Sequence, residues 1–224
     1  AHVVGDSKRV QVKITGQSKK YTAVPLQICY QSDLAVLVVR DPAFQKNSRP
    51  VSIGGLVNLQ DRVRAMGFPV GGDGLSVTVG AVSRVELGDY EIGRVRMLQI
   101  QIDAAINYGN SGGPVFFEDK VIGVAFQGSE EGENLGYIIP ATILNHHVQE
   151  VFSGREYRGF PELPIQTRNL ENTNLRAHYQ MMPEQTGVLI NKIDKLSDAF
   201  EKLREDDVIL SVEGFLVSNA GKIN

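Results

Sequence analysis

The sequence lacks the features that mark several classes of protein. It has a single cysteine, Cys29, so no disulfide can form within the chain. A lone cysteine is compatible with a compartment that keeps thiols reduced. No apolar run approaches the ~18 residues that a membrane-spanning helix needs. The net charge of −3 gives no basic surface of the kind that binds nucleic acid. We therefore expect no membrane span and no nucleic-acid partner.

Signals for cofactors and metals are also scarce. GGDGLS, residues 71–76, is rich in glycine but lacks the lysine of a phosphate-binding loop. The acidic pairs at 130–131 and 206–207 lack calcium-loop spacing, and no Cys/His cluster has zinc spacing. Cys29 has no adjacent base, so we expect a buried bystander. The sequence predicts neither a cofactor nor a metal.

The composition is that of a globular protein, with 42% hydrophobic and 22% charged residues among 224. The first two thirds read as many short strands separated by turns, which predicts a sandwich or barrel of β-strands. A break is expected near Pro25 in the second of them. The expected strands cover residues 9–15, 20–29, 34–39, 61–67, 76–86, 96–103, 114–117, 120–127 and 135–139.

The pattern changes at Pro140. Residues 140–152 have helical spacing of apolar residues, with proline near the start and Gly154 as the stop. A stretch rich in glycine, proline and charge follows, so we place a domain boundary after residue 153. Residues 154–224 then predict a small α+β module, with strands at 163–168, 186–193 and 207–213 and helices at 170–180 and 197–203.

Ser111 lies in the stretch IDAAINYGNSGGPV, residues 102–115. A serine nucleophile needs a base to take its proton and donors to hold the oxyanion that its attack creates. The glycines around Ser111 let the backbone bend tightly and bring N–H groups near a substrate carbonyl. A glycine-rich turn with a local serine hydrogen bond explains the stretch equally well at this point.

The base and its carboxylate must come from elsewhere in the chain. His146 and His147 are adjacent on the predicted helix, point about 100° apart, and are expected to be solvated. His178 in the second module is expected to be solvated too, which leaves His2. Asp33 opens the buried run LAVLVV, and Asp103 is a rival carboxylate. The order His2, Asp33, Ser111 is that of chymotrypsin-type proteases, which are all-β proteins.

Together these residues resemble the HtrA/Deg serine proteases, most of all the plant-type Deg branch. Four motifs carry the resemblance: AHVV at 1–4, SDLAVL at 32–37, DAAINYGNSGGP at 103–114 and GYIIP at 136–140. It implies a mainly β fold, with a chymotrypsin-like double β-barrel protease domain (1–153) followed by a PDZ-like domain (154–224). It also implies that the first strands of the barrel lie upstream of residue 1 and that the PDZ-like domain is incomplete at its C-terminus.

The resemblance assigns roles to residues. Ser111 is the nucleophile, His2 the general base and acid, and Asp33 the group that orients the imidazole. Gly109, Asn110 and Ser111 form the oxyanion hole, Asp103 becomes structural, and loops 68–76, 105–110 and 127–134 are the mobile candidates. Ile106, Leu135 and Ile139 line the substrate pocket, which implies cleavage after small or medium aliphatic residues.

One departure concerns the PDZ-like module. Where the family carries a peptide-binding Leu-Gly step, this chain has Glu162-Leu163-Pro164-Ile165. Proline has no backbone N–H, so Pro164 weakens the capture of a peptide C-terminus. We also expect Asp206-Asp207 to replace a turn glycine of the family.

The leading hypothesis is an ATP-independent serine endoprotease of protein quality control that cleaves unfolded or damaged proteins. The resemblance implies a homo-oligomer, a trimer or a hexamer, in a chloroplast, mitochondrion or nucleus, with the bacterial periplasm as the alternative. The competing hypothesis is a chaperone-like scaffold that acts through the PDZ-like module with an idle triad. A viral-type processing protease would lack the module at 160–213.

Overall fold

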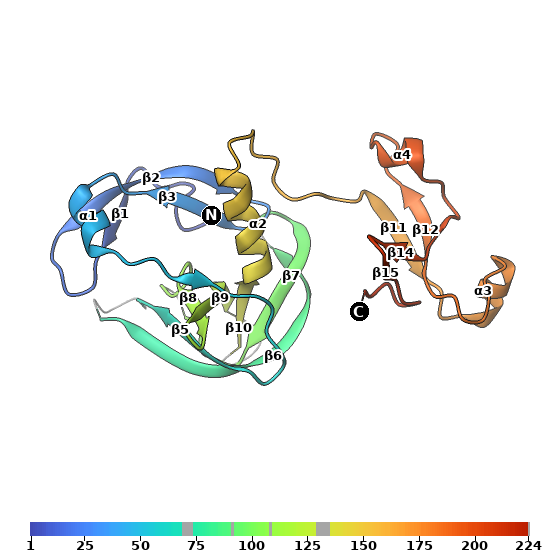
Figure 1. Cartoon of the computed structure of the whole chain (residues 1–224), viewed down its shortest axis with the longest axis horizontal. Coiled ribbons are helices and arrows are strands. Elements are labelled where there is room, and N and C mark those ends of the chain that lie inside the picture. Colours follow the sequence, from blue (N-terminus) through green and yellow to red (C-terminus); the bar gives the residue numbers. More distant parts are fainter. Residues whose placement is uncertain (69–73, 91, 108, 129–134, 224) are drawn as a thin grey trace. The chain divides into compact units, whose positions relative to one another are not determined.

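The structure, a computed structural model, describes residues 1–68, 74–90, 92–107, 109–128 and 135–223. The chain divides into two compact units, Ala1–Phe160 and Pro161–Asn224 (Figure 1). The sequence placed this boundary after residue 153. The first unit extends to Phe160 because residues 157–160 pack against it, as described below.

The first unit begins with a three-stranded antiparallel sheet, β1 (Val10–Lys13), β2 (Lys20–Cys29) and β3 (Leu34–Val38). Alternation of polar and apolar residues in β1 and β2 puts one face of the sheet inward. The pairing of β2 with β3 shifts register between Pro25 and Gln27. Proline has no backbone N–H to donate to the hydrogen bonds between strands. The expected break at Pro25 is therefore a register shift, and β2 continues through it as one strand.

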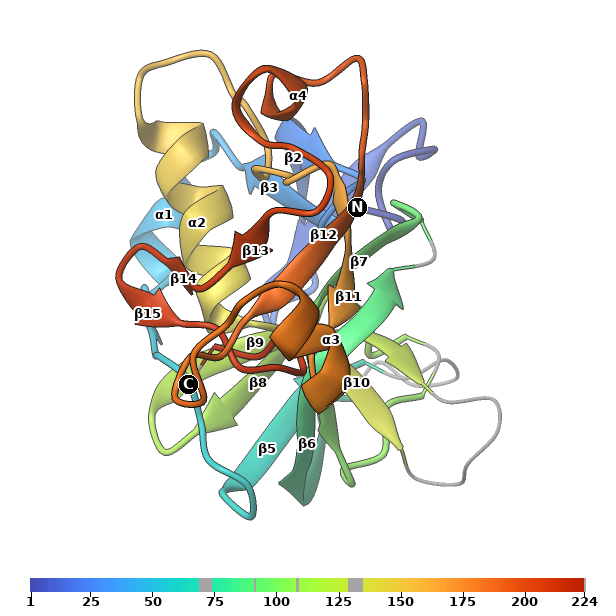
Figure 2. The same ribbon diagram turned by 90° about the vertical axis from the view of Figure 1, so that its right-hand side faces the viewer.

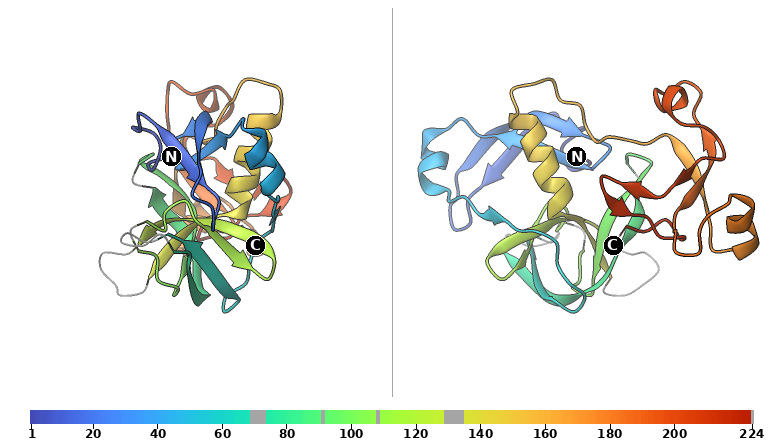
Figure 3. Two further views of the ribbon diagram at one scale, coloured as in Figure 1. Left: turned by 90° about the vertical axis from the view of Figure 1, so that its left-hand side faces the viewer. Right: turned by 45° about the vertical axis from the view of Figure 1, so that its right-hand side comes forward.

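The rest of the first unit is built on a larger sheet that closes on itself. Its order is β10-β7-β6-β5-β8-β9-β4, and β10 also pairs with β9. Among the described residues, strands β5 to β10 therefore form a closed ring, visible in Figure 3. The bounds are β4 (Ser52–Ile53), β5 (Arg62–Gly67), β6 (Ser76–Tyr90), β7 (Val95–Ile102), β8 (Pro114–Phe117), β9 (Lys120–Gly128) and β10 (Gly136–Pro140).

Two clusters of buried side chains hold the first unit together. One fills the barrel, with Val63, Val82, Ile102, Val115 and Ile138 each fully buried. The other joins the barrel to β3 and to helix α2 (Ala141–Phe152) through Leu34, Tyr90, Phe126, Ile139 and Ile143. Burying one such side chain contributes ~1.5–3 kcal/mol, so the second cluster fixes the first sheet against the barrel. The catalytic candidates lie at this junction.

Two helices accompany the strands of the first unit. Helix α2 begins after Pro140 and ends before Gly154, which has a φ of 73°, so the predicted helix and its two boundary residues are confirmed. The short helix α1 (Pro42–Asn47) was not predicted. Its signal was present in the sequence, because Asp41 caps the helix by accepting from the backbone N–H of Ala43 and Pro42 occupies the first turn.

The second unit combines short strands and short helices, labelled in Figure 2. Strands β11 (Ile165–Asn169), β12 (Val188–Ile193) and β13 (Val208–Ile209) form one sheet, and β14 (Ser211–Val212) pairs with β15 (Phe215–Leu216). Helices α3 (Thr173–His178) and α4 (Ala199–Lys202) complete it. A small core of Ile190, Ile193 and Ala199 holds the sheet and α4 together. The order of strands and helices agrees with the α+β expectation.

Candidate active site

A tight turn between β2 and β3 carries Asp33. The backbone N–H of Asp33 donates to the carbonyl of Tyr30 at 3.4 Å. Asp33 itself has a φ of 54°, in the left-handed region that side chains other than glycine adopt at a cost. Residues 30–33 form this segment, which we call the Asp33 turn. The turn places the Asp33 side chain in the interior, where only 3% of it is exposed.

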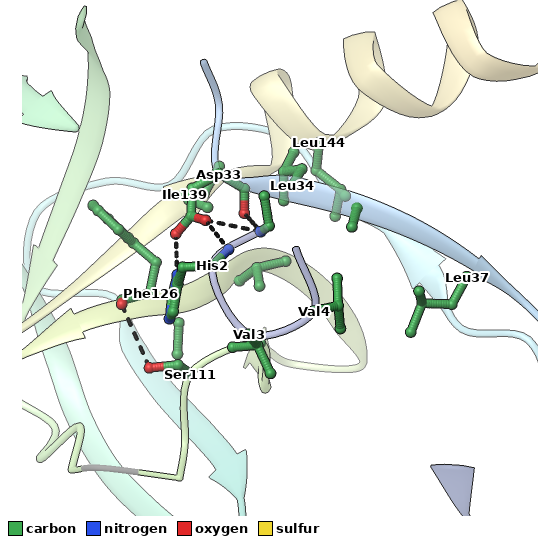
Figure 4. A pocket seen from close by; sticks show the side chains of 15 residues that line it. His2, Val3, Val4, Asp33, Leu34, Leu37, Ser111, Phe126, Ile139 and Leu144 are labelled. Carbon is green, nitrogen blue, oxygen red and sulfur yellow. Dashed lines mark hydrogen bonds and ion pairs between the residues drawn. The ribbon is translucent and has the colours of Figure 1, made fainter. Parts of the chain in front are cut away.

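The carboxylate of Asp33 holds the start of the chain, as Figure 4 shows. Oδ2 lies 2.5 Å from Nδ1 of His2, and Oδ1 accepts from the backbone N–H of His2 at 2.8 Å. The amino nitrogen of Ala1 also donates to Oδ1 at 2.8 Å. Both the backbone and the ring of His2 are therefore fixed by one side chain.

The protonation of this pair follows from its surroundings. Burial opposes ionisation of Asp33, but hydrogen bonds from the Ala1 amine and from the backbone and ring of His2 outweigh it, so the pKa of Asp33 lies below its ordinary value. An ionised carboxylate only accepts hydrogen bonds, so Nδ1 of His2 carries the proton. Nε2 of the neutral imidazole then has a free lone pair, as a general base requires.

Ser111 lies in the connection between β7 and β8, and its neighbours tie the loop to β9. The N–H of Gly112 donates to the carbonyl of Ala125 at 2.7 Å, and the N–H of Gly113 donates to the carbonyl of Asn110 at 2.9 Å. The Ser111 hydroxyl points to the carbonyl of Phe126, at 3.5 Å (Figure 4). Among the contacts of the described residues, no hydrogen bond joins Ser111 to His2.

The backbone N–H groups around Ser111 differ in whether they have a backbone acceptor. Asn110, Gly112 and Gly113 each donate their N–H to a backbone carbonyl. The N–H groups of Gly109 and Ser111 have no acceptor among the described residues. Gly109 has a φ of 96°, which glycine reaches without steric cost. A pair of N–H groups on either side of one residue stabilises a tetrahedral oxyanion when both point at its oxygen.

Gly67, the last residue of β5, lets the loop lie close to the barrel. A Cβ there would be 2.4 Å from Oδ1 of Asn110 and 2.9 Å from its Cα. Asn110 is 4% exposed, so its side chain has no room to move aside. The conformation around Ser111 therefore depends on the absence of a side chain in β5.

A cavity of about 350 Å³ lies beside the three candidate residues. His2, Asp33 and Ser111 all line it, so the structure brings together the residues that the sequence placed in a triad. Its remaining wall is mostly aliphatic, with Val3, Val4, Leu37, Ile139 and Leu144 labelled in Figure 4. An apolar wall around a carboxylate and an imidazole strengthens their interaction, because the local dielectric is low.

The chain is similar to known proteins over its whole length. Residues 1–124 match the family described as trypsin-like peptidase domain. The chain belongs to this family. Over 223 residues it is 43% identical to "Protease Do-like 4, mitochondrial" of Arabidopsis thaliana. This alignment covers all of the present chain and 43% of the plant protein. It is 42% identical over 226 residues to "Protease Do-like 2, chloroplastic" of the same plant, covering all of this chain and 37% of the relative.

Solved structures give the same answer. The HtrA-type protease AlgW with a tripeptide shares 25% of its sequence with this chain, at a TM-score of 0.74 over 94% of this chain and 69% of the other. The resemblance to the Deg/HtrA proteases is confirmed. The chain spans less than half the length of the two plant relatives.

The three residues expected in the substrate pocket of this trypsin-like peptidase lie in different surroundings. Ile139 is 1% exposed and lines the cavity beside His2. Ile106 is 7% exposed and belongs to the barrel core, where a Cβ at Gly136 would lie 2.6 Å from its side chain. Leu135 is half-buried just before β10. Neither Ile106 nor Leu135 lines the cavity of Figure 4.

Asp103 lies outside the cavity. Its Oδ1 accepts a hydrogen bond from the backbone N–H of Ala81, and its own N–H donates to the carbonyl of Ala81 at 3.1 Å. Asp103 thus joins β6 to the start of the nucleophile loop, a structural task. Most of the loop predicted at 127–134, and residues 69–73 and 108 of the other two loops, lie outside the described residues.

The expectation of solvated histidines on α2 is wrong. His147 is 1% exposed, and its Nδ1 lies 2.7 Å from the hydroxyl of Tyr157. Burial lowers its pKa to about 4. Nε2 of His146 donates to the carbonyl of Gly159 at 2.9 Å. The two rings do diverge, as helix geometry requires, but residues that follow the helix contact both of them.

Two residues near the site carried no signal in the sequence. Phe126 supplies the carbonyl that accepts from Ser111, and its ring packs 4.8 Å from that of Tyr90, centroid to centroid. Tyr90 is 1% exposed and donates to the carbonyl of Leu98 at 2.6 Å. Cys29 is buried, as expected.

Two searches concern other classes of site. Among the residues that the structure describes, no group of three or more His, Cys, Asp or Glu side chains is arranged to hold a metal ion. Within the same residues, no helix combines the length and the apolar character needed to cross a membrane.

Proposed function

We propose that this chain is the catalytic part of an ATP-independent serine endoprotease that cleaves unfolded or damaged proteins in protein quality control. The observation that carries the proposal is the 2.5 Å contact between Nδ1 of His2 and Oδ2 of Asp33, in a cavity that Ser111 also lines. The relatives named as Do-like proteases support it.

The reaction begins with a proton transfer. Ser111 turns its hydroxyl from the Phe126 carbonyl towards Nε2 of His2, which takes the proton as Oγ attacks the scissile carbonyl carbon. The imidazolium that forms is stabilised by the ionised Asp33, which stays unprotonated. His2 then protonates the leaving amine as the C–N bond breaks, and the acyl-enzyme remains. Water, activated by the same imidazole, hydrolyses the ester and restores the serine.

The tetrahedral intermediate places a negative charge on the former carbonyl oxygen. In this proposal the N–H groups of Gly109 and Ser111 hold that oxygen, and Asn110 shapes the loop between them. Losing one donor of such a pair typically costs ~10²–10³ in turnover. The N–H groups of Gly112 and Gly113 donate to backbone carbonyls, which supports an ordered loop around these donors.

Specificity is proposed to come from apolar side chains. Ile106, Leu135 and Ile139 would bound the pocket for the residue before the cut, with no charge at its base. Close packing of Ile106 against Gly136 supports a shallow pocket. Small or medium aliphatic residues such as valine, alanine, isoleucine or leucine would then fit. Each methylene changes the selectivity by only ~1–3 kcal/mol.

The second unit is proposed to be a PDZ-like module attached to a double-barrel protease domain. In this proposal residues 162–165 are the peptide-binding stretch, and two of them offer no donor to a peptide. Pro164 has no N–H, and the N–H of Ile165 donates to the carbonyl of Leu163 at 2.8 Å. This arrangement supports weak capture of peptide C-termini. AlgW was solved with a decapeptide and with a tripeptide, which supports peptide binding somewhere in the whole protein.

A second candidate function is a chaperone-like scaffold with an idle triad. The observation that favours it is the Ser111 hydroxyl on the carbonyl of Phe126, with no hydrogen bond to His2 among the described contacts. Assembly into a trimer or hexamer and an organellar location are also proposals. Relatives named as mitochondrial and chloroplastic support the organelle.

Cleavage of an unfolded protein separates these functions. We expect the chain to cut reduced, unfolded casein without ATP, and Ser111→Ala to lower the rate by ~10⁴-fold or more, because the nucleophile is lost. Ser52→Ala, on exposed β4, is the matched control and should cut at the normal rate. Undiminished cleavage by Ser111→Ala would refute the role of Ser111. Binding of casein without cleavage by the unaltered chain would favour the scaffold.

A further inference from the structure

The segment that follows helix α2 is fastened to the first unit by several polar and aromatic contacts. We call residues 155–160 the linker segment, because Phe160 is the last residue before the second unit. Tyr157 contacts His147 at 2.7 Å, and the carbonyl of Gly159 accepts from His146 at 2.9 Å. The ring of Phe160 lies 4.7 Å from that of His146, centroid to centroid.

The same segment reaches the turn that carries the catalytic aspartate. The backbone N–H of Phe160 donates to Oε1 of Gln31 at 3.2 Å. Gly159 has a φ of 72°, and a Cβ there would lie 3.3 Å from the same oxygen. Gln31 is two residues before Asp33, within the Asp33 turn. A link between residues 129 positions apart therefore ends beside the carboxylate that holds His2.

Phe160 also contacts the apolar cluster beneath the site. It packs against the cluster of Leu34, Tyr90, Phe126, Ile139 and Ile143. Leu34 follows Asp33 in the chain, and Phe126 supplies the carbonyl that accepts from Ser111. One residue of the linker segment thus packs against the cluster to which both Leu34 and Phe126 belong.

A second part of the chain, far from the linker segment in the sequence, also packs against the Asp33 turn. Gly93, in the connection between β6 and β7, lies so close that a Cβ would be 2.8 Å from the backbone of Tyr30 and Gln31. The backbone of the turn is therefore confined there, and Asp33 is held at a φ of 54°. Gln31 supplies the side-chain contact between this confined turn and the linker segment.

From these contacts we propose that Gln31 is a positioning residue for the Asp33–His2 pair, and that it acts by holding the linker segment against the Asp33 turn. Gln31 touches neither substrate nor the reacting atoms. Its amide oxygen and the ring of Phe160 keep the turn in the one arrangement that directs Oδ2 to Nδ1 of His2. The inference rests on the proposed protease function.

The test replaces the acceptor and then restores it. Gln31→Leu keeps the size of the side chain but removes the oxygen that accepts from Phe160. Gln31→Glu keeps an acceptor at the same position. Gln45→Leu, on the exposed surface of α1, is the matched control. Each full chain is assayed for kcat and KM on an aliphatic peptide ester, for the pH profile of kcat, and by proton NMR for the downfield resonance of the His2 Nδ1–H.

We expect Gln31→Leu to lower kcat by ~10–10²-fold, because small misplacements in a catalytic group are costly, with KM within about twofold. The apparent pKa in the kcat profile should shift and the downfield resonance should broaden or vanish. Gln31→Glu should restore the resonance and most of kcat, and Gln45→Leu should match the unaltered chain. A variant that merely lost stability would unfold at a lower temperature with an unchanged resonance.

Two results would overturn the inference. One is an unchanged resonance and unchanged kcat in Gln31→Leu. The other is the absence of the resonance from the unaltered chain, because there would then be no held pair to position. The NMR reading needs no turnover. A chain that shows the resonance, loses it in Gln31→Leu and cleaves nothing would uphold the positioning role while refuting the protease function.

Discussion

The two halves of the candidate site differ in how firmly the fold holds them. On the base side, one carboxylate accepts hydrogen bonds from Ala1, from the backbone of His2 and from its ring, and the Asp33 side chain is 3% exposed. On the nucleophile side, the Ser111 hydroxyl makes one long contact of 3.5 Å to Phe126. The ring of His2 is held by the Asp33 carboxylate, whereas the Ser111 hydroxyl is bonded to the carbonyl of Phe126.

This difference indicates where regulation can act at small cost. Displacing His2 requires breaking two part-buried hydrogen bonds to the Asp33 carboxylate, and hydrogen bonds to an ionised group are stronger than neutral ones. Turning Ser111 requires only a rotation about one side-chain bond and the loss of a weak contact. A change from resting to working enzyme would therefore involve residues 109–111 more than the Asp33–His2 pair.

The largest expected effect on kcat comes from replacing Asp33, the carboxylate that holds His2. Asp33→Asn should lower kcat on an unfolded substrate by about 10⁴-fold, because an amide cannot hold the imidazole in the tautomer that leaves Nε2 free. Steady-state kinetics with an aliphatic peptide ester checks this. Asp119→Asn, whose side chain is fully exposed, is the control and should retain full activity. A loss of less than tenfold would assign the carboxylate role elsewhere.

A smaller effect is expected from crowding the nucleophile half. Gly67→Ala brings a Cβ to 2.4 Å from Oδ1 of Asn110, so the loop at 109–111 must shift. We expect kcat to fall by ~10–10²-fold and stability by ~1–3 kcal/mol, the cost of overpacking a filled site. Denaturant unfolding and kinetics measure the two effects. Gly55→Ala, with open space around it, is the control. Unchanged kcat in Gly67→Ala would mean that the loop does not depend on β5.

The smallest effect concerns stability away from the triad. Burial lowers the pKa of His147 from 6.5 to about 4, so the unfolded chain binds the extra proton first on acidification. Neutral His147 makes its full contribution to the free energy of unfolding above pH 6.5, and this contribution is lost as the pH falls towards 4. Thermal unfolding at a series of pH values should show a slope in this window that His147→Gln reduces. His178→Gln, at an exposed position, should leave the slope unchanged.

The sequence indicated the three triad candidates that line the cavity, but it did not indicate the direction of the Ser111 hydroxyl. The order of His2, Asp33 and Ser111 carried the signal, because each of them lies in a motif that requires its residue type. The hydroxyl direction of Ser111 depends on the carbonyl of Phe126, and any residue has a carbonyl, so no side-chain pattern reveals it. The contacts of His146 and His147 were missed because their partners follow a glycine turn, where helical periodicity no longer applies.

Several boundaries of the fold also depended on pairing between strands. Strand β6 extends to Tyr90, whereas the sequence predicted its end at residue 86. It continues because Tyr90 still pairs with Val95, the first residue of β7. The two-residue strand β4 exists only through its parallel pairing with β9. Such pairings are tertiary contacts, which local alternation of polar and apolar residues does not encode.

The proposed function requires Ser111 to be a nucleophile and His2 to be its base. The most direct measurement is labelling of the folded chain with a fluorophosphonate, followed by mass spectrometry of the labelled peptide, with and without an aliphatic peptide ligand. We expect one phosphonyl group per chain on Ser111, faster labelling when the peptide is present, and a much slower reaction in Asp33→Asn. A folded chain that carries no label on Ser111 under either condition would contradict it.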